Sequence, residues 1–425
     1  IAPQASKEFT VPVNGLKSQP GTEYFVNFSV TTVEPEPLIP AGYEIAYDQF
    51  QLPIQAEKRI YKANGPALTT ATSGDELTVS SSKVNFVFNK KSGLVTSYKV
   101  DGTEYFKDGF GIQPNFWRAP NDNDYGNGAP KRLQVWKQSS KNFHVTDVKM
   151  TTENKVVSLK ATYLLAAGNL YVVTYRIYPS GIVNVSAQFT STDMQAAETE
   201  VSEATRMATF TPGSDAARKA ASKLEVPRIG VRFRLPAQMN NVQYFGRGPE
   251  ENYIDRNHGT LVGVYKTTAD KMYFNYVRPQ ENGHHTDTRW IALSPDKGNG
   301  LAIVADSLIG FNALRNSIED FDSEEALPHP YQWNNFSPEE VANHDEKAAR
   351  NVLRRMHHVN DITPRDFVEV CVDMKQQGVG GYDSWGARPE PFHQIPANRD
   401  YSWGFTLVPV RSASQANEVA KYDYQ

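Results

Sequence analysis

Cysteine and long apolar runs are nearly absent from this sequence. Cys371 is the only cysteine among 425 residues, which excludes an intrachain disulfide and a thiolate zinc site. No run reaches the roughly 18 apolar residues that a transmembrane helix needs, and the nearest candidate is interrupted by Gly168 and Asn169. Neither sign of charge dominates, because the net charge is only -4, so the composition gives no reason to expect nucleic acid or a membrane surface as a partner.

The signatures of common nucleophiles and cofactors are missing as well. The sequence has no Gly-x-Ser-x-Gly elbow, no phosphate-binding Gly-x-x-x-x-Gly-Lys loop, no His-Glu-x-x-His helix and no dinucleotide fingerprint between a strand and a helix. A secretory signal would begin with Met and a basic segment, whereas this chain begins Ile-Ala-Pro-Gln. We therefore expect it to be a piece of a longer polypeptide.

Aromatic residues are plentiful, at 11% of the chain, which favours a β-rich protein that handles sugars. Residues 1–60 contain three predicted strands, Glu8–Val13, Glu23–Thr31 and Tyr43–Leu52, whereas an immunoglobulin-like sandwich needs about seven. This pattern predicts the C-terminal part of such a sandwich. The polar segment 61–82 is predicted to be a linker and the first edge of the next domain.

Residues 83–412 have the pattern of one large antiparallel β domain. Val84, Phe86 and Phe88 alternate with more polar neighbours, and Asp101-Gly102 is a strong hairpin signal. So many strands with long loops predict an all-β, two-sheet sandwich, followed by a tail at 413–425. Further strands are predicted at Leu94–Val100, Leu170–Tyr178, Ile182–Phe189, Arg228–Leu235, Leu301–Ala305, Phe367–Met374 and Ser402–Pro409. One helix is predicted over Glu339–Arg355, with Ser337 as N-cap and Pro338 in its first turn, and Thr211–Glu225 is predicted to be an irregular connection.

The glycine-rich stretch Gly378–Gly386 follows a predicted strand and predicts a tight loop with Trp385 near its tip. An aromatic side chain on such a turn, beside an acceptor such as Asp383, can form a platform for the apolar face of a sugar. The alternative is a core tryptophan that closes one end of the sandwich. These residues alone leave both interpretations open.

A polar motif at Asn115–Gly126 combines the guanidinium of Arg118 with a run of amide and carboxylate side chains. Such groups suit recognition of several sugar hydroxyls, although Asn and Asp clusters are also common in turns that bond their own backbone. A calcium loop of the EF-hand type is excluded, because Leu133 stands at the twelfth position where a Glu is required. The candidate sugar-binding residues of this run are Asn121, Asp122 and Asp124.

Two further motifs, a second at Phe245–Arg256 and a third at Arg278–Trp290, carry candidate acid and base groups. Glu250, Glu251 and Asn252 belong to the second motif, and we expect at least one of its two carboxylates to pair with Arg247 or Arg256. The third motif contains Glu281 with His284 and His285, which could exchange protons with a sugar. A purely structural role for these side chains is the alternative, and the two adjacent histidines face opposite sides of a strand, so they do not form a metal site.

Taken in order, these motifs resemble the C-terminal part of the large bacterial β-galactosidases of glycoside hydrolase family two. The resemblance spans essentially the whole chain and rests on Ala41–Phe50 (Ala-Gly-Tyr-Glu-Ile-Ala-Tyr-Asp-Gln-Phe), Arg118–Asp124, Gly246–Tyr253, Glu281-Asn282-Gly283 and Gly380–Trp385. It implies the end of an immunoglobulin-like domain followed by a complete galactose mutarotase-like β-supersandwich. Tyr382 departs from the family pattern, where an acid or amide is common, which leaves the polar contacts of that loop open.

The resemblance also implies that this chain and the rest of the enzyme have different roles. Retaining hydrolysis uses two carboxylates about 5 Å apart, and in this family both lie on a (β/α)8 barrel that this chain lacks, so the chain alone is expected to be inactive and to contain no catalytic residue. Trp385 is expected to be the aromatic platform that reaches into the active site of the barrel. The full set of expected substrate-binding residues is Trp385, Asp383, Arg118, Asn121, Asp122, Asp124, Glu250, Asn252, Glu281 and His284.

Partners and cofactors follow from the same resemblance. The chain itself is expected to bind no cofactor or metal, and Mg²⁺ and Na⁺ would belong to the barrel of the intact enzyme. The expected partners are a β-galactoside such as lactose, the missing N-terminal domains and, in the intact enzyme, further copies of itself. The sequence leaves the bacterial cytoplasm and the periplasm both open. Two alternative functions are a free-standing carbohydrate-binding module and an aldose epimerase that uses Glu281 with His284 or His285.

Overall fold

The computed structural model describes residues 4–13, 15–191, 225–322, 358–380, 383 and 385–424. The chain divides into two compact units, one formed by residues 1–61 and 420–424 and the other by residues 62–419. The predicted helix from Ser337 to Arg355 and nearly all of Thr211–Glu225 lie outside the described residues. Among the described helices, none is long and apolar enough to cross a membrane.

The first unit is built on an antiparallel hairpin of β1 (Tyr24–Thr31) and β2 (Glu44–Leu52), which confirms two of the three predicted strands. The third prediction, Glu8–Val13, is wrong, because this segment forms no regular structure. Pro12 has no N–H to donate to a ladder, and no described strand lies beside the segment to pair with it. The C-terminal β21 (Tyr422–Asp423) returns to this unit and pairs in parallel with β3 (Arg59–Ile60).

The smaller sheet of the second unit has five antiparallel strands in sequence order. They are β4 (Thr69–Ser73), β5 (Glu76–Ser80), β6 (Val84–Asn89), β7 (Leu94–Val100) and β8 (Thr103–Glu104). The hairpin expected at Asp101-Gly102 is present, with positive φ at both residues. The segment expected to be a linker and first edge thus carries a hairpin of its own, β4–β5, and β5 pairs with β6.

The larger sheet has twelve strands and is branched. Its main path runs β10-β11-β12-β13-β20-β18-β17-β15-β16, and β19, β14 and β9 form a branch that starts at β18. Residues Gly300–Ala305 of the long strand β18 pair with β20, whereas Gly310–Leu314 pair with β19. The strands are β9 (Gln113–Asn115), β10 (His144–Glu153), β11 (Val156–Leu164), β12 (Leu170–Ile177), β13 (Val183–Thr190), β14 (Arg228–Pro236), β15 (Asn241–Gly248), β16 (Leu261–Thr268), β17 (His285–Ser294), β18 (Gly300–Leu314), β19 (Phe367–Gln376) and β20 (Tyr401–Val410).

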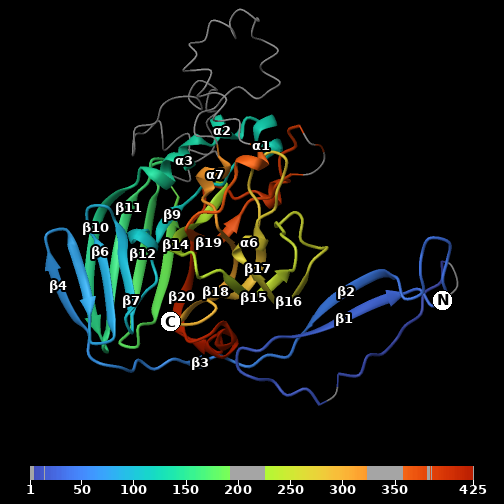
Figure 1. Ribbon diagram of the computed structural model, residues 1–425, viewed down its shortest axis with the longest axis horizontal. Coiled ribbons are helices and arrows are strands. Elements are labelled where there is room, and N and C mark those ends of the chain that lie inside the picture. The colour runs from blue at the N-terminus through green and yellow to red at the C-terminus, as the bar shows by residue number, and fades with distance from the viewer. Residues whose placement is uncertain are drawn as a thin grey trace, which may run out of the picture. The chain divides into compact units, whose positions relative to one another are not determined.

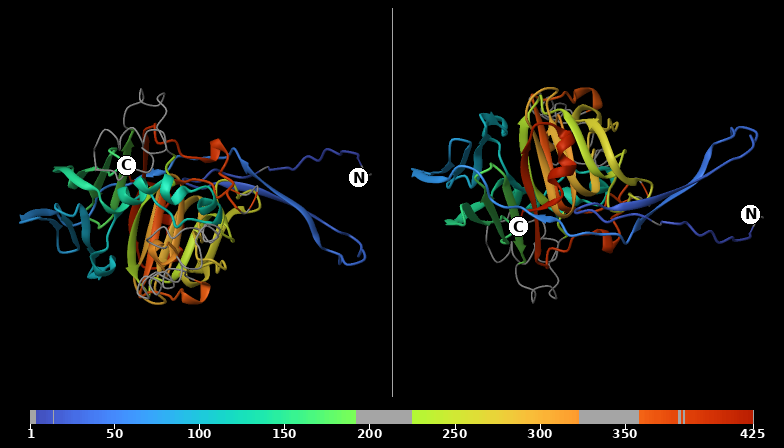
Figure 2. Two further views of the ribbon diagram at one scale, coloured as in Figure 1. Left: turned by 90° about the horizontal axis from the view of Figure 1, so that it is seen from above. Right: turned by 90° about the horizontal axis from the view of Figure 1, so that it is seen from below.

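The two sheets pack face to face through aromatic side chains. Phe86 and Phe88 on β6 contact the ring of Tyr175 on β12, with centroids 5.7 and 6.1 Å apart. Two tyrosine hydroxyls, those of Tyr98 and Tyr163, donate to backbone carbonyls of the opposite sheet region at 2.6 and 2.7 Å, so their polar ends are satisfied inside the core. Figures 1 and 2 show the five-stranded sheet in blue beside the green strands β10–β13. The predicted all-β antiparallel supersandwich is confirmed.

Short helices occupy the connections. The helices α1 (Asp122–Gly126), α2 (Ala129–Arg132) and α3 (Gln134–Lys141) follow one another between β9 and β10. They lie near the end of the larger sheet at which the segment after β19 emerges (Figure 1). The other helices among the described residues are η1 (Lys107–Gly109), α6 (Ala269–Met272), α7 (Ile318–Phe321), η4 (Val359–Asp361), η5 (Pro391–His393), η6 (Ala413–Gln415) and α10 (Ala416–Val419), the last two lying in the segment expected to be a tail.

A fully buried charged cluster is centred on Arg228 at the start of β14. Its guanidinium lies 3.0 Å from a carboxylate oxygen of Glu281, 3.2 Å from Asp373 and 2.9 Å from the side-chain oxygen of Asn312. Burial raises the pKa of the Asp373 carboxyl to about 7, although the charge of Arg228 opposes that shift. Because two carboxylates share one arginine, we expect Asp373 to carry a proton at mildly acidic pH.

We expect the buried carboxyl of Asp373 to make folding stability depend on pH. Its folded pKa is raised above the unfolded value, so its contribution is fully present below about pH 4 and is lost as the pH rises to about 7. The uncharged variant Asp373→Asn removes this titration. Between pH 4 and 7, urea unfolding should therefore show the wild-type chain losing stability relative to Asp373→Asn, by a few kcal/mol at most. A constant difference between the two proteins across that range would contradict the raised pKa.

Candidate functional site

Trp385 is 71% exposed, so the alternative of a core tryptophan is wrong. The turn that carries it is closed by Asp383, whose Oδ1 accepts the N–H groups of Trp385, Gly386 and Ala387 at 3.0, 3.0 and 2.9 Å. These backbone donors lower the pKa of the Asp383 carboxyl. Asp383 is an expected hydrogen-bond acceptor for a sugar. One of its carboxylate oxygens is instead used to shape the turn that presents the indole to solvent.

The first polar motif folds into a scaffold beside this loop. Arg118 is buried and holds both carboxylate oxygens of Asp124 at 3.0 and 3.1 Å, while its remaining nitrogen donates to the carbonyl of Gln377 at 2.8 Å. Burial alone would lower the pKa of the Arg118 guanidinium, but the neighbouring Asp124 outweighs this effect and raises it. Asn121 caps α1 in a capping box with Asp124 and donates to the carbonyl of Val379 at 3.1 Å.

Residues of α1 also contact the loop 378–386, which carries Trp385 and is called the tryptophan loop below. Asn123 accepts the N–H of Gly386 at 3.2 Å. A Cβ atom at Gly126 would lie only 1.9 Å from the carbonyl oxygen of Trp385, so only glycine allows the two main chains to pack this closely. The loop is therefore in direct backbone contact with the first motif.

The third motif reaches the first through side chains that are at least partly exposed to solvent. Gln280 donates to Asp122 at 3.1 Å, and the guanidinium of Arg278 lies 3.8 Å from the ring centroid of Tyr125. Asp122 is exposed, unlike its neighbours Asn121 and Asp124. The motifs that stand far apart in the sequence are thus brought together around one end of the larger sheet.

The second motif is fixed by polar contacts of its own. Glu251 pairs with Arg256 at 2.7 Å, as expected from the sequence, and accepts the N–H of Gly283 at 2.7 Å. Asn252 is fully buried: its amide donates to the carbonyls of Arg247 and Glu250, and its side-chain oxygen accepts from Thr286. Asn252 therefore holds the loop in shape, whereas Glu250 is exposed to solvent.

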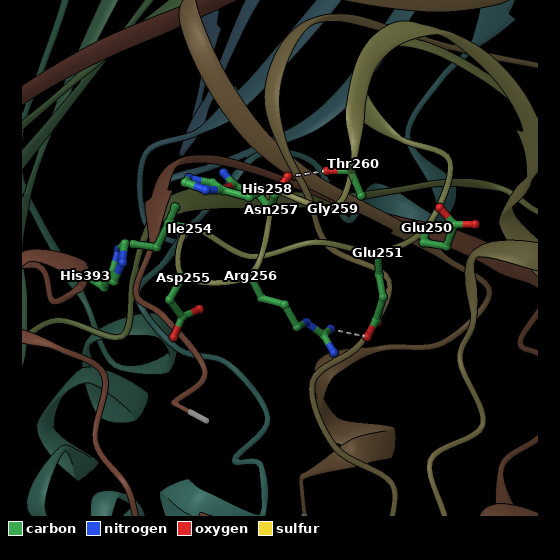
Figure 3. Close-up of a pocket in the computed structure, with 10 residues that line it drawn as sticks. All are labelled: Glu250, Glu251, Ile254, Asp255, Arg256, Asn257, His258, Gly259, Thr260 and His393. Atoms are coloured by element: carbon green, nitrogen blue, oxygen red, sulfur yellow. Dashed lines mark hydrogen bonds and ion pairs between the residues drawn. The ribbon is translucent and has the colours of Figure 1, made fainter. Parts of the chain in front are cut away.

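An open polar pocket of about 600 Å³ lies along this second motif (Figure 3). Glu250, Asp255, His258 and His393 are among its lining residues. Ring stacking with a sugar needs an aromatic face, and the lining has no Trp, Tyr or Phe. The pocket thus offers charged and polar groups without a sugar platform.

Glu281 and His284 are buried in the cluster around Arg228. The His284 ring hydrogen-bonds Asn312 at 3.0 Å and stacks on Tyr253, with centroids 5.4 Å apart. Burial, and then the charge of Arg228, lower the pKa of His284 well below its usual value, so this imidazole stays neutral. The cavity beside Glu281 is only about 20 Å³, enough for one water, whereas pockets for small molecules measure roughly 300–1,000 Å³.

The assignment of individual residues to sugar binding stays a prediction. The structure adds residues that the sequence analysis did not single out: Asp255, which accepts backbone N–H groups of the tryptophan loop, and Arg228 with Asp373 in the core. Asp255 lies inside the second motif, so its place in that motif could have indicated a functional role. Arg228 and Asp373 lie within ordinary strand patterns, and nothing in the sequence around them indicates such a role. Among the residues with described positions, no three His, Cys, Asp or Glu side chains gather as metal ligands.

Comparisons with known proteins agree with the motifs. The profile of the family described as beta galactosidase small chain matches residues 80–407, and that of beta-galactosidase, domain 4 matches residues 1–53. The beta-galactosidase of Priestia megaterium is 32% identical over 96% of this chain and 34% of its own length. That of Streptococcus thermophilus is 25% identical over 95% of this chain and 33% of its own length. The chain thus spans about a third of the length of these curated relatives.

Two solved structures share the general arrangement at low similarity. A putative mutarotase from Salmonella typhimurium aligns with 84% of this chain and 97% of its own at a TM-score of 0.38 and 8% identity. Galactose 1-epimerase from Lactobacillus acidophilus aligns with 82% of this chain and 98% of its own at a TM-score of 0.38 and 9% identity. A likeness of this degree carries no argument about function. The match over residues 80–407 covers most of the chain, and the chain belongs to the beta-galactosidase small chain family.

Proposed function

We propose that this chain is the C-terminal part of a β-galactosidase that hydrolyses terminal β-D-galactosides, such as lactose, with retention. In this proposal the chain completes and gates an active site whose two catalytic carboxylates lie on a (β/α)8 barrel outside it. Mg²⁺ and Na⁺, where the enzyme uses them, would bind to the barrel, and the intact enzyme would be a homo-oligomer. The observation that carries the proposal is an exposed indole on a loop held by surrounding motifs.

The chemistry of Trp385 suits a sugar platform. An indole face can stack on the apolar face of a galactose ring, and its N–H can donate to a hydroxyl. Because Asp383 and Asn123 hold the flanking backbone, little conformational entropy would be lost when a sugar binds. The platform would then help to orient the substrate for chemistry performed by the barrel.

Three acids of the second and third motifs support a non-catalytic role. Glu251 and Glu281 are each bound to an arginine, and Asp255 accepts two backbone N–H groups. Retaining hydrolysis requires one acid free to donate a proton and one carboxylate free to attack, about 5 Å apart. Carboxylates that are already committed to structural partners are poorly suited to either task.

The first unit supports the proposal that the intact enzyme has additional domains. In the β1–β2 hairpin the side chains of Val26, Phe28 and Val30 share one face with Phe50, and Phe28 and Phe50 are in ring contact at 5.8 Å. Val30 and Phe50 are each 53% exposed. A two-stranded hairpin is at best marginally stable by itself, so further strands from the rest of the enzyme would cover this apolar face.

The alternative functions have less support. An aldose epimerase would need Glu281 and His284 to reach a sugar, but both are buried, and the cavity beside Glu281 is only about 20 Å³. A free-standing carbohydrate-binding module would have to bind through Trp385, because the pocket of about 600 Å³ is lined by no Trp, Tyr or Phe. Weak stacking on one indole favours a role in a larger site over independent binding.

We expect the purified chain to show no hydrolysis of a chromogenic β-galactoside above background, because it lacks the barrel carboxylates. Addition of the separately produced N-terminal portion of the same enzyme should restore turnover, measured against the intact enzyme. The matched control is the same assay with the N-terminal portion alone. Turnover by this chain that copurifies with it and disappears in Glu250→Gln or Glu281→Gln would refute the proposal.

In the intact enzyme, Trp385→Ala should raise KM about tenfold, which corresponds to about 1.4 kcal/mol of lost substrate binding. The fold should be unaffected, because the side chain is 71% exposed. Trp385→Phe, which keeps a ring face, should retain more of the affinity. Phe392→Ala, at another aromatic residue that is 70% exposed, is the control and should leave KM unchanged. An unchanged KM in Trp385→Ala would contradict the platform.

A further inference from the structure

The loop that carries Trp385 is held at its start by a carboxylate from another part of the chain. Asp255 Oδ1 accepts the N–H of Val379 at 3.0 Å, and its Oδ2 accepts the N–H of Gly380 at 2.9 Å. We propose that Asp255 is a positioning residue for substrate binding, which fixes the main chain before Trp385 so that the indole is presented in one orientation. This inference rests on the proposed function of Trp385 as a sugar platform.

The approach of Asp255 depends on Gly378. A Cβ atom at residue 378 would lie 2.3 Å from Asp255 Oδ2 and 2.5 Å from its Cγ, so any larger residue would displace the carboxylate. Two consecutive backbone N–H groups that converge on one carboxylate form charge-assisted hydrogen bonds, which are stronger than those between neutral groups. Glycine and aspartate therefore form a matched pair at the start of the loop.

Asp255 is itself fixed by neighbours in the second motif. Asn252 and Tyr253 are buried, and Tyr253 stacks on the buried ring of His284. The adjacent Arg256 is paired with Glu251 at 2.7 Å (Figure 3). These contacts fix Asp255 relative to the core of the domain, and Asp255 in turn fixes the main chain of the loop.

The far side of the loop has a separate attachment. Asn123 accepts the N–H of Gly386, and the carbonyl of Trp385 packs against Gly126. With Asp255 at one end and α1 at the other, the described backbone on both sides of Trp385 is held by groups outside the loop. Asn121 still donates to the carbonyl of Val379 when Asp255 is removed, so the first end of the loop should loosen without detaching and the domain should stay folded.

Hydrogen–deuterium exchange of the chain alone tests this attachment independently of any enzymatic activity. In Asp255→Asn the side chain keeps one acceptor oxygen and turns a donor toward the other N–H. The amides of Val379 and Gly380 should then exchange about ten to a hundred times faster, whereas the peptides of the core strands should not change. The control is Asp296→Asn, which removes the same charge from an exposed aspartate that accepts from Asn241 at 2.9 Å. Unchanged exchange in Asp255→Asn would overturn the inference.

A double-mutant cycle in the intact enzyme tests whether Asp255 acts through Trp385. Asp255→Asn should raise KM several-fold with a smaller change in kcat, and Trp385→Ala combined with Asp255→Asn should have the KM of Trp385→Ala alone. Fully additive effects of the two substitutions would overturn the positioning role. Faster exchange in Asp255→Asn together with an unaltered KM in Trp385→Ala would instead refute the platform, and with it the proposed part of Asp255 in substrate binding.

Discussion

Hydrogen bonds from side chains to the main chain of one loop determine how the proposed site is presented. Trp385 can be 71% exposed and still have a defined position because Asp255, Asn123 and Asp383 satisfy the N–H groups on both sides of it. A glycine-rich loop without these acceptors would sample many conformations, since glycine restricts the backbone least. Two of these acceptors, Asp255 and Asn123, precede the tryptophan by more than a hundred residues, so they reach it only through the fold of the supersandwich.

The polar motifs contribute mainly to this support. Arg118, Asn121, Asp124 and Asn252 look like sugar-binding residues in the sequence, yet each bonds to other parts of the protein. Two of them, Arg118 and Asn121, donate to the carbonyls of Gln377 and Val379 at the start of the tryptophan loop. Polar residues in a short motif can therefore serve a binding site without facing it, because a buried donor or acceptor must find a partner inside the fold.

The sequence predicted much of the fold because strand signals are local. Alternation and hairpin residues located β6, β7, β12 and β13 within one or two residues. It did not predict β4, β10 or β16 as separate strands, since exposed edge positions rich in polar residues lack clear alternation. The burial of Glu281 against an arginine could not be predicted either. Its partner Arg228 lies 53 residues away in the sequence, and the two residues meet only through sheet pairing. For the same reason, the sequence shows that Asp255 belongs to the second motif but does not show that it contacts Val379.

The distribution of exposed and buried groups argues for a shared active site. The charged cluster around Arg228 is sealed from solvent, and the proton on Asp373 affects stability more directly than chemistry. Among the described residues, the exposed groups at the motif end include the indole of Trp385 and the carboxylates of Asp122 and Glu250, and the nearby pocket is lined by no Trp, Tyr or Phe. Such a surface offers one aromatic face and several hydrogen-bond acceptors to a sugar. The proposed function would place the bond-breaking acids on another domain and would use the indole of Trp385, whose flanking backbone is held by Asp255 and Asn123, to restrict how the substrate enters.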